Sequence, residues 1–235
     1  TSLSVFDMLH NMRQIDDTTF AHSINVALIG RMLGEWLELS EEDLDVLTLA
    51  GLLHDIGKCT IDPNILLKPS ALTPKEYEAV KKHAENGAEV LAGQNLDDRI
   101  RQAALMHHER CDGSGYPAGL TKDEIPDFAK IIAIADVYDA MTSKLPYHDP
   151  IPPSAAAEYI LESAGAECDP ALVDIFQQKV ALYPAGCEVL LSDGSLALVM
   201  ENFGDAMQTP RVKVISSGEL LDLRSKNAGG LVILE

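Results

Sequence analysis

The sequence predicts a mainly α-helical protein, a bundle of about seven to eight helices followed by a small antiparallel β unit. Three observations predict this class. Apolar residues recur at helical spacing through most of the chain, and the hydrophobic fraction of 46% allows a packed core. At Tyr183-Pro184 the pattern changes to short β-rich runs. We therefore expect a helical domain over residues 1–183 and a small β subdomain over residues 184–235.

Start signals and apolar stripes locate the expected helices. Ser40 is a typical N-cap residue, and Thr73, Pro74 and Glu76 form a capping box with proline in the first turn. Prolines 63 and 69 mark a turn-rich connector before that box. The predicted helical segments are 2–13, 16–39, 40–58, 73–93, 96–109, 129–143, 154–164 and 170–182.

The β unit is predicted from runs of β-branched and aliphatic residues that are separated by turn residues. Asp193-Gly194, Gly204 and Ser217-Gly218 interrupt these runs, which suggests three to five antiparallel strands. The runs are 187–194, 195–202, 211–216 and 230–235. The unit carries no residues of evident chemical function, so we expect a small docked module or a surface for a partner.

Composition limits the possible functions. The net charge of −19 disfavours binding to nucleic acid polymers or anionic membranes, and a phosphate ester would need a local cation. We expect no membrane segment, because no run of about 18 apolar residues occurs. The scattered cysteines favour a reducing, cytoplasmic setting. Because the chain begins with Thr1, we expect a piece of a longer protein, with a sensory or receiver domain upstream.

Histidines are the most informative residues. Five of the seven lie on, or at the end of, the apolar stripes of successive predicted helices. A single histidine in such a place is usually an ordinary core residue, but burying five without partners would cost about 1–3 kcal/mol each. Two carboxylates in apolar surroundings join them. The candidates are His22, His54, Asp55, His83, His107, His108 and Asp136.

These seven residues predict a binuclear metal centre. Mixed imidazole and carboxylate ligands suit Mn, Fe, Co, Ni or Zn better than Ca or Mg, and seven ligands are too many for one ion. Two ions of this kind would polarise a phosphoryl oxygen and activate a water molecule as hydroxide. The residues therefore predict hydrolysis of a phosphate ester.

Several motifs carry a resemblance to a known family. His54-Asp55, with His22 before it, resembles the HD superfamily of metal-dependent phosphohydrolases. The runs HHERCDGSGYPAGL (107–120) and IADVYDAMTS (134–143) are similar to the HD-GYP family in particular, and the resemblance covers roughly residues 20–148. Members of that family have an HD-type helical bundle and hydrolyse the bacterial second messenger cyclic di-GMP to pGpG, and often on to GMP.

The resemblance also implies roles for individual residues. The seven candidates fall at the family's metal-ligand positions, with Asp55 as the bridging carboxylate and Lys58 neutralising the phosphate. The implied cofactors are two transition-metal ions, Fe or Mn first, with Ni, Co or Zn as alternatives. The residues expected to contact substrate are Lys58, Arg110, Gly113, Gly115, Tyr116, Lys144 and His148.

The chain departs from the family pattern at three places, of which Cys111, where members often have a larger side chain, affects only the loop. Thr18 stands where some members have a glutamate for a third metal, so we expect two ions. Leu145 replaces a phosphate-binding arginine, and His148 a following basic residue, which favours a different cyclic dinucleotide such as cyclic GMP-AMP as an alternative substrate. A third hypothesis is a weakly active or inactive regulatory module that contacts diguanylate cyclase (GGDEF) domains.

Two acidic residues near the motifs have more than one interpretation. Glu109 and Arg110 either pair with each other on the surface or position the loop through a charge-assisted hydrogen bond. Asp139, one turn after Asp136, is expected to orient a metal ligand without binding the metal itself.

Overall fold

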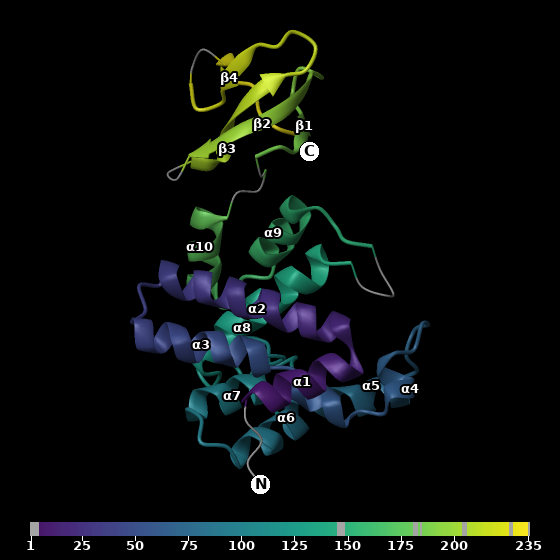
Figure 1. Cartoon of the computed structure of the whole chain (residues 1–235). Coiled ribbons are helices and arrows are strands. Elements are labelled where there is room, and N and C mark those ends of the chain that lie inside the picture. Colours follow the sequence, from purple (N-terminus) through teal and green to yellow (C-terminus); the bar gives the residue numbers. More distant parts are fainter. Residues whose placement is uncertain are drawn as a thin grey trace.

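The chain forms a bundle of helices followed by a four-stranded antiparallel sheet, as the sequence predicts (Figure 1). This is a computed structural model, and it describes residues 5–144, 149–180, 183, 185–203, 206–225 and 228–234. Among the described residues, no helix is both long and apolar enough to cross a membrane. The helices are α1 (Val5–Ile15), α2 (Asp17–Trp36), α3 (Glu41–Leu53), η1 (Ile56–Thr60), α4 (Pro63–Leu66), α5 (Pro74–Lys81), α6 (His83–Ala92), α7 (Asp98–Met106), α8 (Asp127–Thr142), α9 (Pro153–Glu162) and α10 (Pro170–Lys179).

The described helices are more numerous than expected because two predicted segments are broken. The segment 40–58 is helix α3 followed by the short 3₁₀ helix η1, and the segment 73–93 is α5 and α6, which meet at Lys82. The second break lies where the backbone of Gly57 packs directly against the carbonyl of His83. The capping box at the start of α5 is present as predicted.

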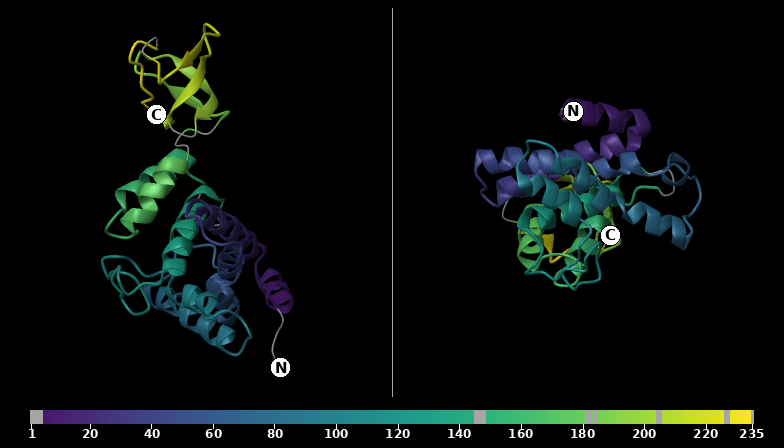
Figure 2. Two further views of the ribbon diagram at one scale, coloured as in Figure 1. Left: turned by 90° about the vertical axis from the view of Figure 1, so that its left-hand side faces the viewer. Right: turned by 90° about the horizontal axis from the view of Figure 1, so that it is seen from below.

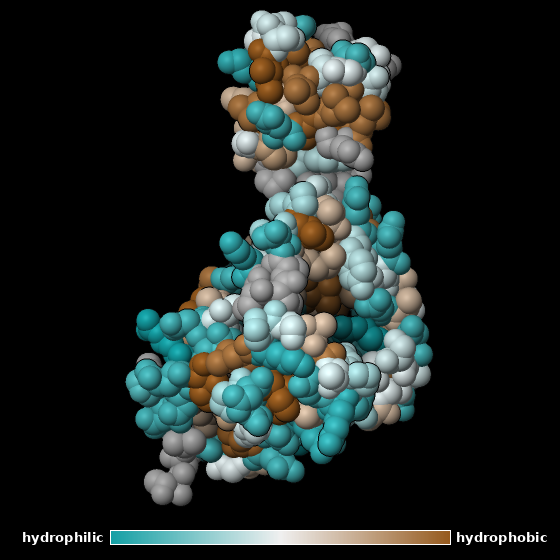
Figure 3. Space-filling model, turned by 90° about the vertical axis from the view of Figure 1, so that its right-hand side faces the viewer, coloured by the Kyte–Doolittle hydropathy of each residue, from teal (hydrophilic) through white to brown (hydrophobic). Residues whose placement is uncertain are grey.

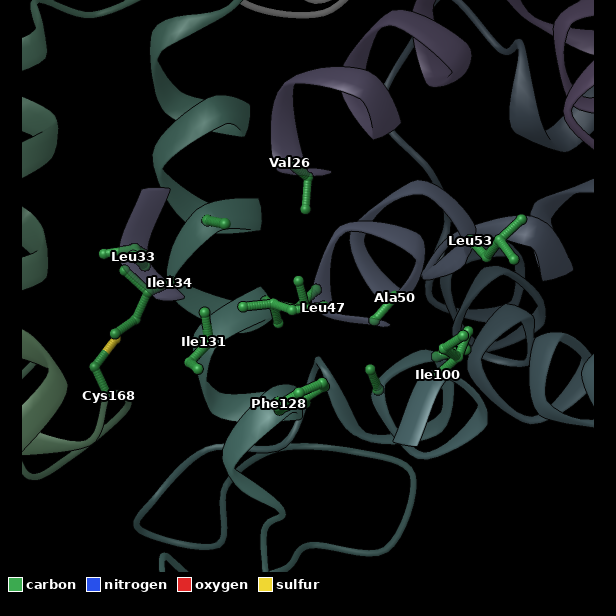
Figure 4. Close-up of a cluster of buried hydrophobic side chains, with 14 of the residues drawn as sticks. Val26, Leu33, Leu47, Ala50, Leu53, Ile100, Phe128, Ile131, Ile134 and Cys168 are labelled. Carbon is green, nitrogen blue, oxygen red and sulfur yellow. The ribbon is translucent and has the colours of Figure 1, made fainter. Parts of the chain in front are cut away.

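The helical core forms where α2, α3 and α8 pack together. Gly51 makes the close approach of α2 and α3 possible, because a Cβ atom there would lie 2.6 Å from Ala27 Cα. Val26, Leu47 and Ile131 point into the space between these helices (Figure 4). The segments that carry the histidines pack against this buried apolar region.

The sheet has its own core. Its strands are β1 (Glu188–Leu190), β2 (Leu196–Phe203), β3 (Ala206–Val214) and β4 (Leu220–Asp222), in that order. The predicted strand at 230–235 is wrong: only Ile233 forms an isolated bridge, to Leu191, and β4 was not expected. The buried cluster is Val189, Leu191, Ala197, Val199, Val212 and Val214.

The sheet lies beyond α9 and α10, at one end of the bundle (Figures 1 and 2). Its buried cluster shares no residue with the helical core. Hydrophobic side chains are also exposed on this unit (Figure 3), among them Leu196, Ile215 and Leu220. The domain boundary at 183/184 stays a prediction, which the separate cores support.

Candidate metal centre

The fold brings the seven predicted ligands together from five parts of the bundle. They form two groups, and within each group the candidate ligand atoms lie within 4.8 Å of one another. His22 lies on α2, Asp136 on α8, and the others near the ends of α3, α6 and α7. The first group is Asp55, His83, His107 and His108, and the second is His22, His54 and Asp136.

Glycine lets the ligand-bearing segments approach closely. A Cβ atom on Gly57 would lie 1.9 Å from His83 O and 2.5 Å from Gly87 N. Only glycine therefore allows η1 to touch the first turn of α6. This contact places Asp55, just before η1, beside His83, the first residue of α6.

Backbone carbonyls orient three of the imidazole rings. The Nδ1 atoms donate to carbonyl oxygens in the preceding turn, at 2.7 Å for His54, 2.7 Å for His83 and 3.1 Å for His107. With Nδ1 protonated, each Nε2 keeps its lone pair, as a metal ligand requires. Two of these Nε2 atoms face each other: His83 Nε2 lies 3.4 Å from His107 Nε2.

Buried polar atoms without partners test whether a metal fits. His54 Nε2 and Asp55 Oδ1 are buried and have no hydrogen-bond partner among the described residues. An orphaned polar atom of this kind costs about 1–3 kcal/mol, so such atoms are rare in folded proteins. Ions held by these nitrogens and oxygens would remove that cost. The two groups are thus consistent with a binuclear site for transition-metal ions.

Asp55 lies between the two groups. Its Oδ1 is 3.3 Å from His83 Nε2 and 3.9 Å from His107 Nε2, in the first group. Its Oδ2 is 3.3 Å from His54 Nε2 and 3.9 Å from His22 Nε2, in the second. Each carboxylate oxygen therefore faces a different group, which is the arrangement that a bridging ligand needs.

Charges around Asp55 keep it ionised. Burial alone would raise its pKa, but the ammonium of Lys58, 2.5 Å from Oδ2, and the neighbouring imidazoles hold the pKa of Asp55 well below its usual range. Burial lowers the pKa of His107 well below normal and that of His108 to about 3. These two imidazoles are therefore neutral at pH 7, the state in which histidine binds metal.

Asp139 orients His22, as the sequence predicts. Its Oδ2 lies 2.7 Å from His22 Nδ1, while Oδ1 accepts from Asn25 Nδ2 at 2.9 Å and from Ser143 Oγ at 2.8 Å. The other nitrogen, His22 Nε2, lies 3.0 Å from Asp136 Oδ1. Although burial opposes it, hydrogen bonds to Asp136 and Asp139 raise the pKa of His22 to about 10. Metal binding at this position must therefore displace a proton.

The loop after the paired histidines is fastened by Glu109. Its carboxylate is 2% exposed and accepts from Ala118 N at 2.7 Å and from Leu120 N at 2.9 Å. Arg110 instead lies 3.4 Å from Glu167. The surface pairing of Glu109 with Arg110 is therefore wrong, and the loop-positioning interpretation of Glu109 is correct.

The same loop packs against the metal ligands. The Tyr116 ring stacks on His108, with centroids 4.7 Å apart and the planes at 28°. Gly113 has a φ of 81°, and a Cβ atom on Gly115 would lie 2.4 Å from Arg110 N. Both glycines are therefore required by the shape of the loop.

A cavity of about 850 Å³ opens beside the two groups. This volume is within the range of about 300–1,000 Å³ for small-molecule sites. Of the predicted site residues, it is lined by His22, Lys58, His108 and Asp136. Arg110, Gly113, Gly115, Tyr116 and Lys144 lie outside the lining, and Leu145 and His148 lie outside the described residues.

Sequence reasoning missed a second part of the cavity wall. That part is formed by the connector 65–72 and by Tyr77 and Val80 of α5. The signal was present as Ile65-Leu66-Leu67, a run that is too apolar for a simple surface turn. Thr18, at the expected third-metal position, also lines the cavity.

Comparisons with known proteins agree with this geometry. The HD domain family matches residues 8–172. A cyclic di-GMP phosphodiesterase of Pseudomonas aeruginosa is 39% identical over 210 residues, which are 89% of this chain and 50% of that protein. A 3′3′-cGAMP-specific phosphodiesterase of Vibrio cholerae is 36% identical over 173 residues, or 73% of this chain and 33% of that protein.

Solved structures show the same fold. A protein of Bdellovibrio bacteriovorus described as an HDG"Y"P protein aligns with a TM-score of 0.55 at 22% identity, over 67% of this chain and 52% of that one. The chain belongs to the HD domain family. Within it, the HD pair and the GYP loop place the chain with the HD-GYP proteins. It spans about half the length, or less, of these curated relatives.

Proposed function

We propose that this chain is a metal-dependent phosphodiesterase that hydrolyses cyclic di-GMP to pGpG, with GMP as an alternative end product. The position of Asp55 supports this proposal most strongly, because its two oxygens face two separate groups of ligands. The cavity beside those groups is large enough for a small organic phosphate. The relatives named above, which cleave cyclic dinucleotides according to their names, support the substrate class.

In this proposal the seven residues hold two ions, with Fe or Mn as our first choice. The bound ions would supply Lewis acidity toward a phosphoryl oxygen and would lower the pKa of a water molecule. Asp55 bridges the two positions, and Asp139 keeps the His22 ring in place through its Nδ1. Lys58, which lies beside Asp55 and lines the cavity, offsets the negative charge of the incoming phosphate.

Other predicted residues have supporting roles in this proposal. Glu109 fastens the loop that stacks Tyr116 on His108, so Tyr116, Gly113 and Gly115 shape the cavity through His108. Contacts of Arg110, Lys144 and His148 with the substrate remain proposals. The binding of GGDEF domains and the presence of an upstream sensory domain also remain proposals.

Cyclic GMP-AMP is a second candidate substrate. Leu145 and His148 stand where the family carries basic residues, so the grip on a second guanylate phosphate is expected to be weaker. The Vibrio cholerae relative is named for this dinucleotide. A regulatory module without activity is less well supported, because it would have no use for seven clustered ligand side chains, five of them buried.

A substrate panel with two variants tests the proposal. Metal-loaded protein, prepared without oxygen, is incubated with cyclic di-GMP and cyclic GMP-AMP, and the products are separated by chromatography. Asp55→Ala is expected to abolish turnover and bound metal. Asp45→Ala, a control at an exposed aspartate on α3, is expected to keep both. Two bound ions without cleavage of either dinucleotide would overturn the proposal.

A further inference from the structure

Part of the cavity lining, which we call the apolar wall, consists of the connector 65–72 together with Tyr77 and Val80 of α5. Leu67 and Tyr77 line the cavity and are 52% and 51% exposed, although large apolar side chains are usually buried. Leu66, Leu72 and Val80 extend the same wall. Side chains of this kind bind apolar or aromatic groups, and the ammonium group of Lys68, which also lines the cavity, is paired with Glu76, so the wall is suited to a part of the ligand that carries no charge.

This wall is joined directly to the metal ligands. Val80 lines the cavity, and its carbonyl accepts the hydrogen bond that orients His83, at 2.7 Å. Tyr77 lies three residues earlier on α5, so both side chains are on the same face of the helix. A ligand in the cavity can therefore reach the metal ligands and the wall at the same time.

Two ion pairs and a capping box hold the wall in place. Lys68 donates to Glu76 Oε2 at 2.7 Å, and the same oxygen accepts from Thr73 N at 2.7 Å. This fixes the connector against the start of α5. On α5 itself, Lys81 pairs with Glu78 at 2.6 Å and lies 5.4 Å from the centroid of the Tyr77 ring. The wall is therefore formed before any ligand binds.

The remaining part of the cavity lining differs in chemistry. It carries His22, His108, Asp136 and the ammonium group of Lys58. A nucleotide has a similar division, with an anionic phosphate at one end and, at the other, a flat, uncharged heteroaromatic base whose faces stack on aromatic rings. Base stacking on an aromatic ring contributes about 1–3 kcal/mol per base and does not require a particular base.

We propose that Leu67, Tyr77 and Val80 form a nucleobase subsite, in which a purine base of the substrate lies against Tyr77 while the phosphate lies at the metal ligands. This inference rests on the proposed function, and it deepens it by naming the residues that bind the base. The apolar connector 65–72 then contributes to the affinity for the substrate, separately from the hydrolysis at the metal centre.

The test compares two ligands that share the phosphate and differ in the base. KM for cyclic di-GMP reports on the phosphate and the base together, whereas the inhibition constant of inorganic phosphate reports on the metal ligands alone. Tyr77→Ala is expected to raise KM about tenfold, as lost stacking predicts, and Leu67→Ala is expected to raise KM by a smaller factor through lost apolar contact, with kcat and the phosphate inhibition constant unchanged in both. Tyr77→Phe keeps the ring and is expected to restore most of the affinity.

A matched control uses an exposed leucine elsewhere. Leu28 on α2 is 61% exposed and lies outside the cavity lining, so Leu28→Ala should leave KM unchanged. An unchanged KM in both cavity variants would overturn the subsite while leaving the proposed function standing. A parallel rise in KM and in the phosphate inhibition constant, with loss of bound metal, would also overturn it. Absence of any turnover by the wild-type protein would overturn the proposed function and this inference together.

Discussion

The substitution Glu109→Gln tests whether the buried carboxylate fastens the GYP loop. In the wild-type protein, two backbone N–H groups, of Ala118 and Leu120, donate to its two oxygens. Glutamine keeps the shape of the side chain but offers one oxygen and one NH₂ group. One N–H group then faces another donor, and the remaining hydrogen bond loses its charge.

The expected cost follows from the burial of this group. A hydrogen bond to a charged partner contributes about 1.5–3 kcal/mol, and a buried donor left without an acceptor costs about 1–3 kcal/mol. We therefore expect the free energy of unfolding to fall by about 3 kcal/mol, which lowers Tm by about 6–12 °C for a chain of this size. Activity should fall as well, because the loop also places Tyr116 on His108.

Urea unfolding of the metal-free protein measures this effect without a contribution from bound metal. Glu167→Gln is the matched control, since Glu167 is a partly exposed carboxylate that pairs with Arg110 and Tyr159. It should cost no more than about 1 kcal/mol, as exposed pairs do. If Glu109→Gln lowers the free energy of unfolding by no more than this control, the anchoring role of Glu109 is refuted.

Three further predictions concern packing, acid stability and metal binding. Gly57→Ala places a methyl group against His83 O and should destabilise the protein by about 3 kcal/mol, whereas Gly93→Ala, with nothing within 4 Å of the added Cβ, should cost less than about 1 kcal/mol in the same urea titration. Burial raises the pKa of the Asp169 carboxyl, but the N–H group of Ala171 and the ammonium groups of Lys122 and Lys130 together lower that pKa below its usual value. The stabilising effect of Asp169 is therefore present above the unfolded pKa of about 3.9 and is lost as the pH falls through the folded pKa. The free energy of unfolding of Asp169→Asn should therefore fall less than that of the wild type between pH 5 and pH 2 or so; equal slopes would contradict this. Removal of metal with a chelator should lower the Tm of the wild type, because metal at a hundredfold excess over Kd contributes about 2.7 kcal/mol of stability, and should leave Asp55→Ala, which lacks the carboxylate that faces both groups, nearly unchanged in a thermal scan.

The clustering of the seven candidate ligands could be predicted from the sequence because each lies on the apolar stripe of a helix or at its end. Burial of a charged or polar side chain on such a stripe needs a partner, and His22, His54 and Asp136 have no sequence neighbours that could serve. The bridging position of Asp55 came from the family resemblance, and the distances to both groups support it.

The features that the sequence did not reveal depend on contacts between distant segments. The break at Lys82 arises where Gly57 meets His83, which no local pattern indicates. The run 230–235 alternates like a strand, yet its described residues form only an isolated bridge, from Ile233 to Leu191, with flanking hydrogen bonds from Ser192 N to Val232 O and from Leu234 N to Leu190 O. Local propensity is a weak guide in such cases, since pairing decides whether a run becomes a strand.

Anomalous scattering from crystals of the metal-loaded protein, recorded at the absorption edge of the bound metal, tests the central claim most directly. We expect two peaks about 3.5–4 Å apart, on either side of the Asp55 carboxylate. One peak should lie among His83, His107 and His108, and the other among His22, His54 and Asp136. A single peak, or peaks away from Asp55, would contradict the binuclear centre and the hydrolysis that depends on it.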